Sequence, residues 1–225
     1  MSSEESGSIH EKNELPLKIT KSEPLRHQGI ESVTFKVEVL DKNNEARLIA
    51  LKKIKKEEFS GIEEMKKSKR FYDFLKNLPG FGKFVPDTAY FIARESSQDR
   101  PHGYMLQKLI KGKRLDELPD EELYADVELV KQLSEFIDAA INVFEQPSKE
   151  IGGTPDLYGN KLSANYLFNP RHSSNVIISE NPDEKGNRVF LVDTNRQIQQ
   201  KSGIGESFQK YIGSKLQIKQ LKRWK

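Results

Sequence analysis

The sequence predicts an α+β fold, with a strand-rich first half that contains one helix and a helical second half that carries a β-hairpin. Apolar side chains alternate with polar ones between residues 17 and 54, as in strands with one buried face. They recur every three or four residues in residues 57–78 and 127–144, which indicates two helices. Short apolar runs at residues 175–179 and 189–193 flank a polar turn and predict the hairpin.

The first half, residues 15–111, is expected to be a five-stranded antiparallel sheet with one helix. The predicted strands lie at residues 17–19, 33–40, 47–54, 85–94 and 103–110. The polar residues 41–45 form a hairpin turn between the second and third strands. The helix of residues 57–78 separates the third and fourth strands and stops at Pro79-Gly80.

The second half, residues 112–203, is expected to be mainly helical around the hairpin. A short helix begins at residues 118–122, and a long one covers residues 127–144. The apolar face predicted for the long helix consists of Val130, Leu133, Ile137, Ala140, Ile141 and Phe144. Residues 204–225 form a basic C-terminal helix, whose Leu216, Ile218 and Leu221 are expected to pack on the body.

Composition and charge narrow the class of protein. The 225 residues suffice for one domain or two small lobes. The 37 basic and 34 acidic residues are mixed along the chain, so no specific nucleic-acid partner is predicted. The absence of cysteine excludes disulfides and thiolate metal sites. Residues 1–14 resemble a disordered leader without the apolar core of a secretory signal, and no run is long enough to span a membrane, so we expect a cytoplasmic protein.

Asp193 is the most informative candidate residue. It follows the apolar run Val189-Phe190-Leu191-Val192. A carboxylate at the end of a buried strand is costly unless a metal ion, a basic side chain or several N–H groups compensate it. Asp193 is therefore predicted to have a partner, and a metal ion is one candidate.

The order of these elements resembles the protein-kinase-like fold in the style of the small aminoglycoside phosphotransferases, over residues 17–200. Ala50-Leu51-Lys52 resembles the Ala-x-Lys of the third strand, and the segment from Met105 to Gly112 resembles the hinge. Pro155-Asp156-Leu157 is similar to the catalytic loop, and Leu191-Val192-Asp193 to the apolar pair and aspartate that bind magnesium. The resemblance implies a bilobal fold with a reduced helical C-lobe.

The resemblance also implies roles for individual residues around ATP and Mg²⁺. Lys52 would bind the phosphates, and it shares a strand face with Leu48 and Ala50 that should point inward. The site residues implied are Lys52, Glu64 (or Glu63) to position Lys52, Gln107 and Leu109 at the adenine, Asp156 at the acceptor hydroxyl, and Asn175 (or Asn165 or Asn160) with Asp193 at the metal. Without a role in binding, Lys52 would be a solvated lysine and Asp156 a turn residue.

Departures from the family pattern leave two functions open. Only one glycine, Gly29, lies between the first two strands, Thr154-Pro155 replaces the usual histidine, and Lys161 occupies the usual asparagine position. No helical subdomain for a protein substrate is expected after Asp193. The sequence predicts either an ATP- and Mg²⁺-dependent phosphotransferase acting on a small-molecule or other hydroxyl, or an inactive, pseudokinase-like module that binds a protein partner. A weaker alternative is a scaffold protein that binds anionic surfaces through its basic tail around Trp224.

Overall fold

The structure is a computed structural model of the chain. It describes residues 18–25, 32–40, 46–54, 62–94, 98, 100–145, 155, 157, 173, 175–193, 219 and 222. The chain forms two compact units. The first unit contains Met1–Lys69 and Asp87–Leu109, and the second contains Arg70–Pro86 and Ile110–Lys225.

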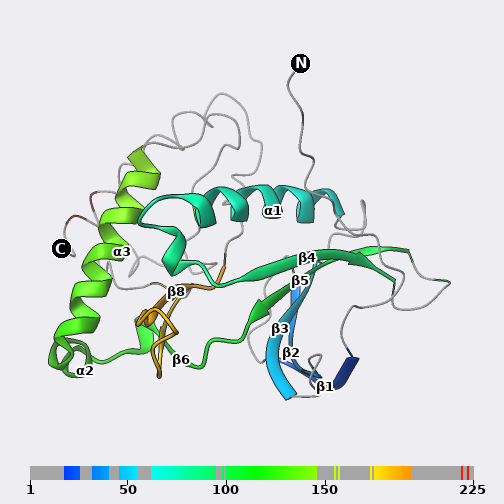
Figure 1. Cartoon of the computed structure of the whole chain (residues 1–225), viewed down its shortest axis with the longest axis horizontal. Helices are drawn as coiled ribbons and strands as arrows, with labels where there is room; N and C mark the ends of the chain where they lie inside the picture. Colours follow the sequence, from blue (N-terminus) through cyan, green and yellow to red (C-terminus); the bar gives the residue numbers. More distant parts are fainter. Residues whose placement is uncertain are drawn as a thin grey trace. The chain divides into compact units, whose positions relative to one another are not determined.

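The first unit contains a five-stranded antiparallel sheet in the order β1-β2-β3-β5-β4 (Figure 1). Its strands are β1 (Lys18–Pro24), β2 (Ser32–Leu40), β3 (Ala46–Ile54), β4 (Thr88–Ala93) and β5 (His102–Lys108). The prediction of an α+β chain with such a sheet is confirmed. The first strand is longer than predicted, because β1 continues at the sheet edge through exposed polar residues that show no alternation.

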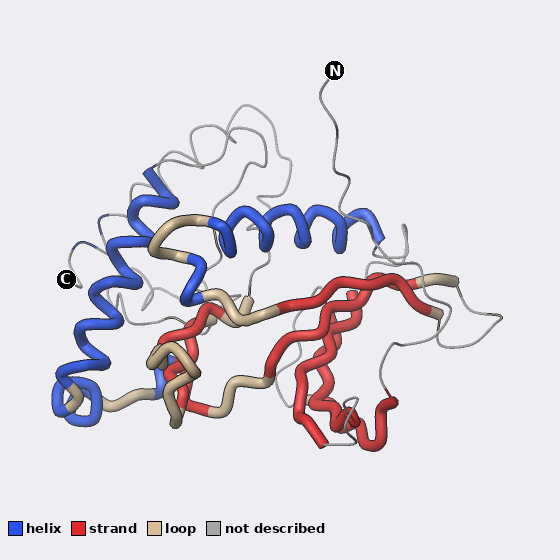
Figure 2. The backbone as a smooth tube through the Cα atoms, viewed as in Figure 1, coloured by secondary structure: helices blue, strands red, loops and turns tan. Residues whose placement is uncertain are grey.

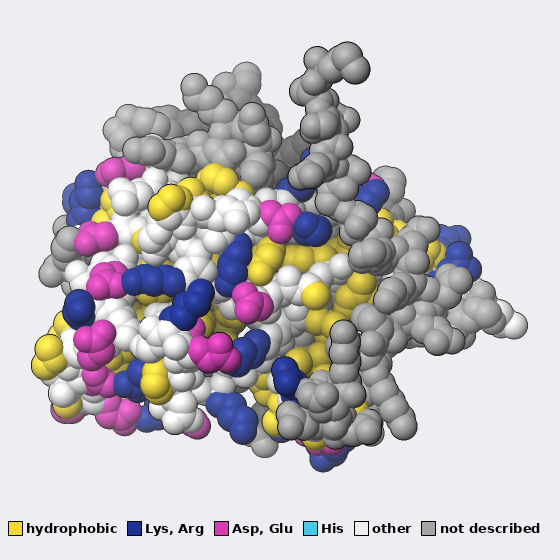
Figure 3. Space-filling view, viewed as in Figure 1, with side chains coloured by type: hydrophobic (Ala, Val, Ile, Leu, Met, Phe, Trp, Pro, Cys, Tyr) yellow, Lys and Arg dark blue, Asp and Glu magenta, His cyan; other side chains and the backbone are white. Residues whose placement is uncertain are grey.

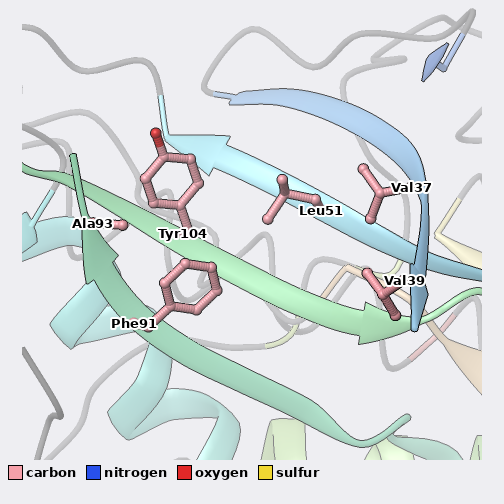
Figure 4. Close-up of a cluster of buried hydrophobic side chains, with 6 residues drawn as sticks. All are labelled: Val37, Val39, Leu51, Phe91, Ala93 and Tyr104. Carbon is pink, nitrogen blue, oxygen red and sulfur yellow. The ribbon is translucent and has the colours of Figure 1, made fainter. Parts of the chain in front are cut away.

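One face of this sheet carries a cluster of buried apolar side chains, shown in Figure 4. Its members are Val37, Val39, Leu51, Phe91, Ala93 and Tyr104. Phe91 on β4 lies directly opposite Tyr104 on β5, and their rings stack with centroids 5.4 Å apart. The alternation seen in the sequence therefore corresponds to burial on this face.

The other face of the sheet contacts helix α1 (Ile62–Asn77). Met65 on α1 and Ile92 on β4 are buried together, and Ile62 and Tyr90 pack against them. The predicted helix was to begin at residue 57, but residues 57–61 lie outside the described part of the chain. The fourth strand begins three residues later than predicted, because Val85 is a buried residue of the second unit instead of a strand residue.

The second unit combines helices with a three-stranded antiparallel sheet in the order β6-β7-β8, coloured by element type in Figure 2. Its elements are η1 (Gly82–Phe84), β6 (Gly112–Arg114), η2 (Leu115–Glu117), α2 (Asp120–Ala125), α3 (Val127–Glu145), β7 (Val176–Ser179) and β8 (Val189–Leu191). The two predicted helices and the predicted hairpin are present. Strand β6 is an addition, because Gly-Lys-Arg has no apolar pattern to indicate a strand.

Aromatic side chains form the centre of the second unit. The Phe84 and Phe136 rings meet edge to face with centroids 5.2 Å apart, and Phe81 lies 5.9 Å from Phe136. The predicted buried face of α3 is wrong at Val130, which is 37% exposed. The side chain of Leu129 is buried in the first turns instead.

Two further predictions fall largely outside the described residues. These are the leader and the C-terminal helix, of which only Lys219 and Lys222 are described, both as helical. No helix in the described part of the chain is long and apolar enough to cross a membrane.

Candidate functional site

Lys52 lies in the middle of the first unit's sheet. On β3 it is paired with Thr34 of β2 and Met105 of β5, and Met105 is paired in turn with Tyr90 of β4. Directly paired residues point to the same face of a sheet. Lys52 is therefore on the face that carries Tyr90, which is the face covered by α1.

Glu63 and Glu64 are in the first turn of α1. Glu64 accepts a hydrogen bond from Lys67 at 3.0 Å, and Glu63 accepts one from Lys66 at 2.9 Å. The Glu64 side chain is 24% exposed and that of Glu63 is 58% exposed. Glu64, beside the buried Met65, is thus the less exposed of the two carboxylates, and its pairing with Lys52 stays a prediction.

Gln107 shares the face of Lys52 two residues further along β5, because it is paired with Ala50 of β3. Its Nε2 donates a hydrogen bond to Thr88 Oγ1 at 3.0 Å, so this amide is already bonded within the sheet. Strand β5 ends at Lys108, and Leu109 follows as a half-buried residue outside the ladder. The adenine contacts implied for Gln107 and Leu109 stay predictions.

Asn175 and Asp193 lie at the open end of the hairpin in the second unit. The last pair of the ladder is Val176 with Leu191, and beyond it the Val192 N–H donates to the Asn175 carbonyl at 2.9 Å. The backbone thus brings Asn175 to within one residue of Asp193. A carboxylate and an amide oxygen are ligand types that Mg²⁺ takes while it keeps water and phosphate oxygens in its remaining positions. Both side chains carry such ligand atoms. Successive residues of a strand point to opposite faces, so Asn175, which is paired with Val192, lies on the other face from Asp193 in a regular ladder. Binding of one ion by both side chains stays a prediction.

Asp193 is less buried than the sequence predicts. The sequence places Asp193 at the end of a buried strand, whereas β8 ends two residues earlier, at Leu191. Val192 and Asp193 are both half-buried. The carboxylate therefore keeps part of its hydration, and the desolvation cost inferred from the sequence is smaller than predicted.

Asp156 and the alternatives Asn160 and Asn165 lie outside the described residues. Next to Asp156 in the sequence, Pro155 and Leu157 are both buried. The Leu157 carbonyl accepts a hydrogen bond from Ser173 Oγ, and Ser173 is 3% exposed. Ser173 precedes Asn175 by two residues, so this contact joins the predicted catalytic segment to the start of the hairpin. A single serine in a loop carries no sequence signal for such a contact.

A buried amide attaches the hairpin turn to α3. Gln132 is 8% exposed, and its Oε1 accepts a hydrogen bond from the Arg188 N–H at 2.9 Å. Its Nε2 donates to the Gly186 carbonyl, also at 2.9 Å. Asn187, which is 5% exposed, donates from Nδ2 to the carbonyls of Val189 at 2.8 Å and Lys83 at 3.1 Å. These contacts hold the hairpin against α3 and η1.

Asp126 carries the clearest electrostatic effect in the second unit. Its carboxylate accepts the Leu129 N–H at 3.0 Å and so caps the start of α3. The Arg188 guanidinium donates to the other carboxylate oxygen. The backbone hydrogen bond and then the arginine lower the pKa of Asp126, while partial burial opposes this shift.

The described residues contain no cluster of three or more histidine, aspartate or glutamate side chains that would form an all-protein metal site. No protein-family model matches the sequence, and no curated protein matches it either. The candidate residues therefore rest on the chain's own sequence and structure, separately in each unit: Lys52, Glu64 and Gln107 in the first, and Asn175 and Asp193 in the second.

Proposed function

We propose that the chain is a kinase-like protein that binds ATP with Mg²⁺ and transfers the γ-phosphoryl group to a hydroxyl of a small molecule. The observation that supports the proposal is the backbone hydrogen bond between Val192 and Asn175, which brings the backbones of Asn175 and Asp193 near one another at the open end of a hairpin. When bound, Mg²⁺ supplies positive charge that offsets the charge of the β- and γ-phosphates.

In this proposal the chain's side chains mainly bind and orient the nucleotide. The Lys52 ammonium donates hydrogen bonds to the phosphates, and Glu64 keeps Lys52 extended. Gln107 and Leu109 lie at the adenine. The Asp156 carboxylate accepts the proton of the acceptor hydroxyl as its oxygen bonds to the γ-phosphorus. The bond from that phosphorus to the β–γ bridging oxygen breaks, and ADP leaves with its electron pair.

Support for Lys52 comes from the first unit alone. Lys52 occupies a central strand of an antiparallel sheet, on the face that α1 covers, and the first turn of α1 is acidic. A lysine on that face has a carboxylate-bearing helix beside its sheet, which is the setting expected for an ammonium that must be oriented.

A thermal-shift experiment tests the nucleotide claim. Wild type with ATP and Mg²⁺ at about 100 times the dissociation constant should gain about 2.7 kcal/mol of stability over Mg²⁺ alone. Asp193→Ala should lose most of this gain. Glu184→Ala is the matched control, because Glu184 is an exposed acidic residue of the same hairpin. A wild type whose melting temperature does not respond to ATP contradicts the proposal.

A module that binds ATP without transferring phosphoryl groups is the second candidate. It is favoured by the single glycine between the first two strands and by Thr154-Pro155 in place of histidine. Release of γ-phosphate from labelled ATP, to water or to a panel of small alcohols, separates the two. A thermal shift without release in wild type indicates the binding module, whereas release that Asp156→Asn abolishes indicates the enzyme.

A further inference from the structure

The exposed large hydrophobic side chains of the described residues are concentrated at one place. They are Tyr124, which is 64% exposed, Val127 at 80% and Val130 at 37%. Tyr124 is in the last turn of α2, and Val127 and Val130 are three residues apart at the start of α3, on one side of that helix. These three residues are called the α2–α3 patch.

The patch continues the apolar face of α3 beyond the core. Val130 precedes Ile137 by seven residues, so the two side chains lie on nearly the same side of the helix. Ile137 is 2% exposed, whereas Val130 is open to solvent. The buried leucine side chains in α2 and the first turn of α3 are Leu123 and Leu129. Single exposed apolar residues are ordinary, but several together mark an interaction surface.

Acidic residues outnumber basic ones around the patch, although the exposed Lys131 lies one helical turn after Val127. The segment from Leu115 to Val130 contains no lysine, arginine or histidine. Its acidic residues are Asp116, Glu117, Asp120, Glu121, Glu122, Asp126 and Glu128. Figure 3 shows hydrophobic and acidic side chains next to one another over α2 and the start of α3, at the lower left, with some basic side chains among them. Such a surface repels phosphate groups, which argues against nucleic acid or an anionic bilayer.

Part of this charge is already compensated within the second unit. Lys113 Nζ lies 2.6 Å from Glu122 Oε2, and Arg188 pairs with Asp126. Arg114 pairs with Asp116 at 3.2 Å and with Glu117 at 2.8 Å. Glu121 and Glu128 are exposed. The amide of Gln132, which donates to Glu128 at 3.3 Å, leaves the charge of that carboxylate in place. Carboxylates next to exposed apolar side chains remain to face a partner.

We propose that the α2–α3 patch is a docking surface for a basic segment of another protein. Apolar side chains of that segment cover Tyr124 and Val127, and its lysines or arginines face Glu121 and Glu128. Charge complementarity selects this partner over an acidic one.

One described residue of the chain's basic tail, Lys222, lies away from the patch. Lys222 Nζ lies 3.0 Å from Glu145 Oε1, at the C-terminal end of α3. Val127 and Glu145 are separated by about 27 Å along the helix, at 1.5 Å per residue. Lys222 therefore makes its ion pair at the end of α3 opposite to the patch.

Labelled peptides of defined composition test the proposal by fluorescence anisotropy at about 0.1 M salt. The probe is a twelve-residue peptide of lysine and leucine in helical spacing. Two comparison peptides carry serine in place of leucine, or glutamate in place of lysine. Wild type should bind the lysine–leucine peptide at least about tenfold more tightly than either comparison peptide.

Variants assign the binding to the patch. The doubles Tyr124→Ser with Val127→Ser, and Glu121→Gln with Glu128→Gln, should each weaken binding by about tenfold. Because all four side chains are exposed, these variants should melt within a few degrees of wild type. The matched control is Glu180→Gln with Glu184→Gln, which removes two exposed carboxylates at the β7–β8 turn and should bind as wild type does.

Three kinds of result overturn the proposal, and the second can take two forms. The first is equal binding of the leucine and serine peptides, which indicates charge alone. The second is unchanged binding by the Tyr124 and Val127 double variant, or no binding by wild type. The third is sedimentation of wild type as a dimer that this double variant converts to a monomer, which assigns the patch to a second copy of the chain.

Discussion

The β7–β8 turn contacts α3 and η1 through two buried side-chain amides, those of Gln132 and Asn187. Gln132 offers one acceptor and one donor to backbone groups of the turn, and each bond is 2.9 Å long. Asn187 donates to two carbonyls, and its own N–H donates to Asp183 Oδ1 at 2.8 Å. A turn cannot satisfy all its backbone groups through a ladder, so side-chain amides supply the missing partners.

The effect of pH should be visible at Asp126. Because its pKa is lowered in the fold, the ionised carboxylate stabilises the protein above the unfolded pKa of about 4, and this contribution is lost as the pH falls through the folded pKa. Asp126→Asn keeps an oxygen to cap α3 but loses the charge. The Asp126 side chain is 32% exposed, so we expect a deficit of about 1 kcal/mol or less at pH 7.

Urea unfolding at about pH 7, 5 and 3 measures this difference. The deficit of Asp126→Asn should be smaller at pH 3 than at pH 7, because the charge contribution starts to be lost once the pH falls below the unfolded pKa. Glu121→Gln, an exposed change in the same region, serves as the control and should match wild type throughout. A deficit of equal size at pH 7 and pH 3 would show that shape, and not charge, is responsible.

At the scale of elements, β6 shows how a strand forms without an apolar pattern. It pairs with β7, with Gly112 opposite Ser179. A Cβ at Gly112 would lie 2.0 Å from the Ile178 carbonyl oxygen, so the two backbones approach to a distance that only glycine permits. The sheet of the second unit therefore depends on one glycine at its edge.

Gly112→Ala should destabilise the second unit by about 1–3 kcal/mol, because the added methyl group meets rigid backbone. The measurement is chemical unfolding followed by circular dichroism. Gly186→Asn is the control: Gly186 has a φ of +81° with no atom near a built Cβ, and asparagine tolerates that conformation at a cost of at most about 1 kcal/mol. Equal stability of Gly112→Ala and wild type would mean that β6 can shift away from β7 to make room for the methyl group without loss of stability, which contradicts the prediction.

At the scale of the whole molecule, each unit has its own sheet with a central strand. Strand β3 is paired with β2 and β5, and β7 is paired with β6 and β8. Strand β1 is an edge strand with a register irregularity between Ile19 and Lys21, and its side chains from Thr20 to Glu23 are exposed. Protection of the backbone should therefore differ strongly between strands.

Hydrogen–deuterium exchange with mass spectrometry tests this order. Peptides from β3 and β7 should exchange most slowly, and those from β1 should exchange early, because an edge strand opens without disrupting the rest of the sheet. Peptides from α2, a short helix with a single buried side chain, provide an internal reference for fast exchange. Equal protection of β1 and β3 would contradict the observed strand order.

Part of the candidate site could be predicted because it depends on local pairing. Asn175 and Asp193 flank the two strands of one hairpin. The pairing of those strands therefore brings the backbones of Asn175 and Asp193 near one another. The face of Lys52 followed from the period of two along β3. The contacts of Gln132 with Gly186 and Arg188 could not be predicted, because they join residues far apart in the sequence. The same holds for Ser173 with Leu157.

The sequence by itself determined which segments are strands and helices, because periodic burial is written into the order of apolar and polar residues. It also determined the turn chemistry and the candidate residues. Only the tertiary structure decided that Val130 is exposed, that β8 ends before Asp193, and that Gly-Lys-Arg forms a strand. Each of these depends on which distant segment packs against the residue, and a linear pattern of hydrophobicity does not contain that information.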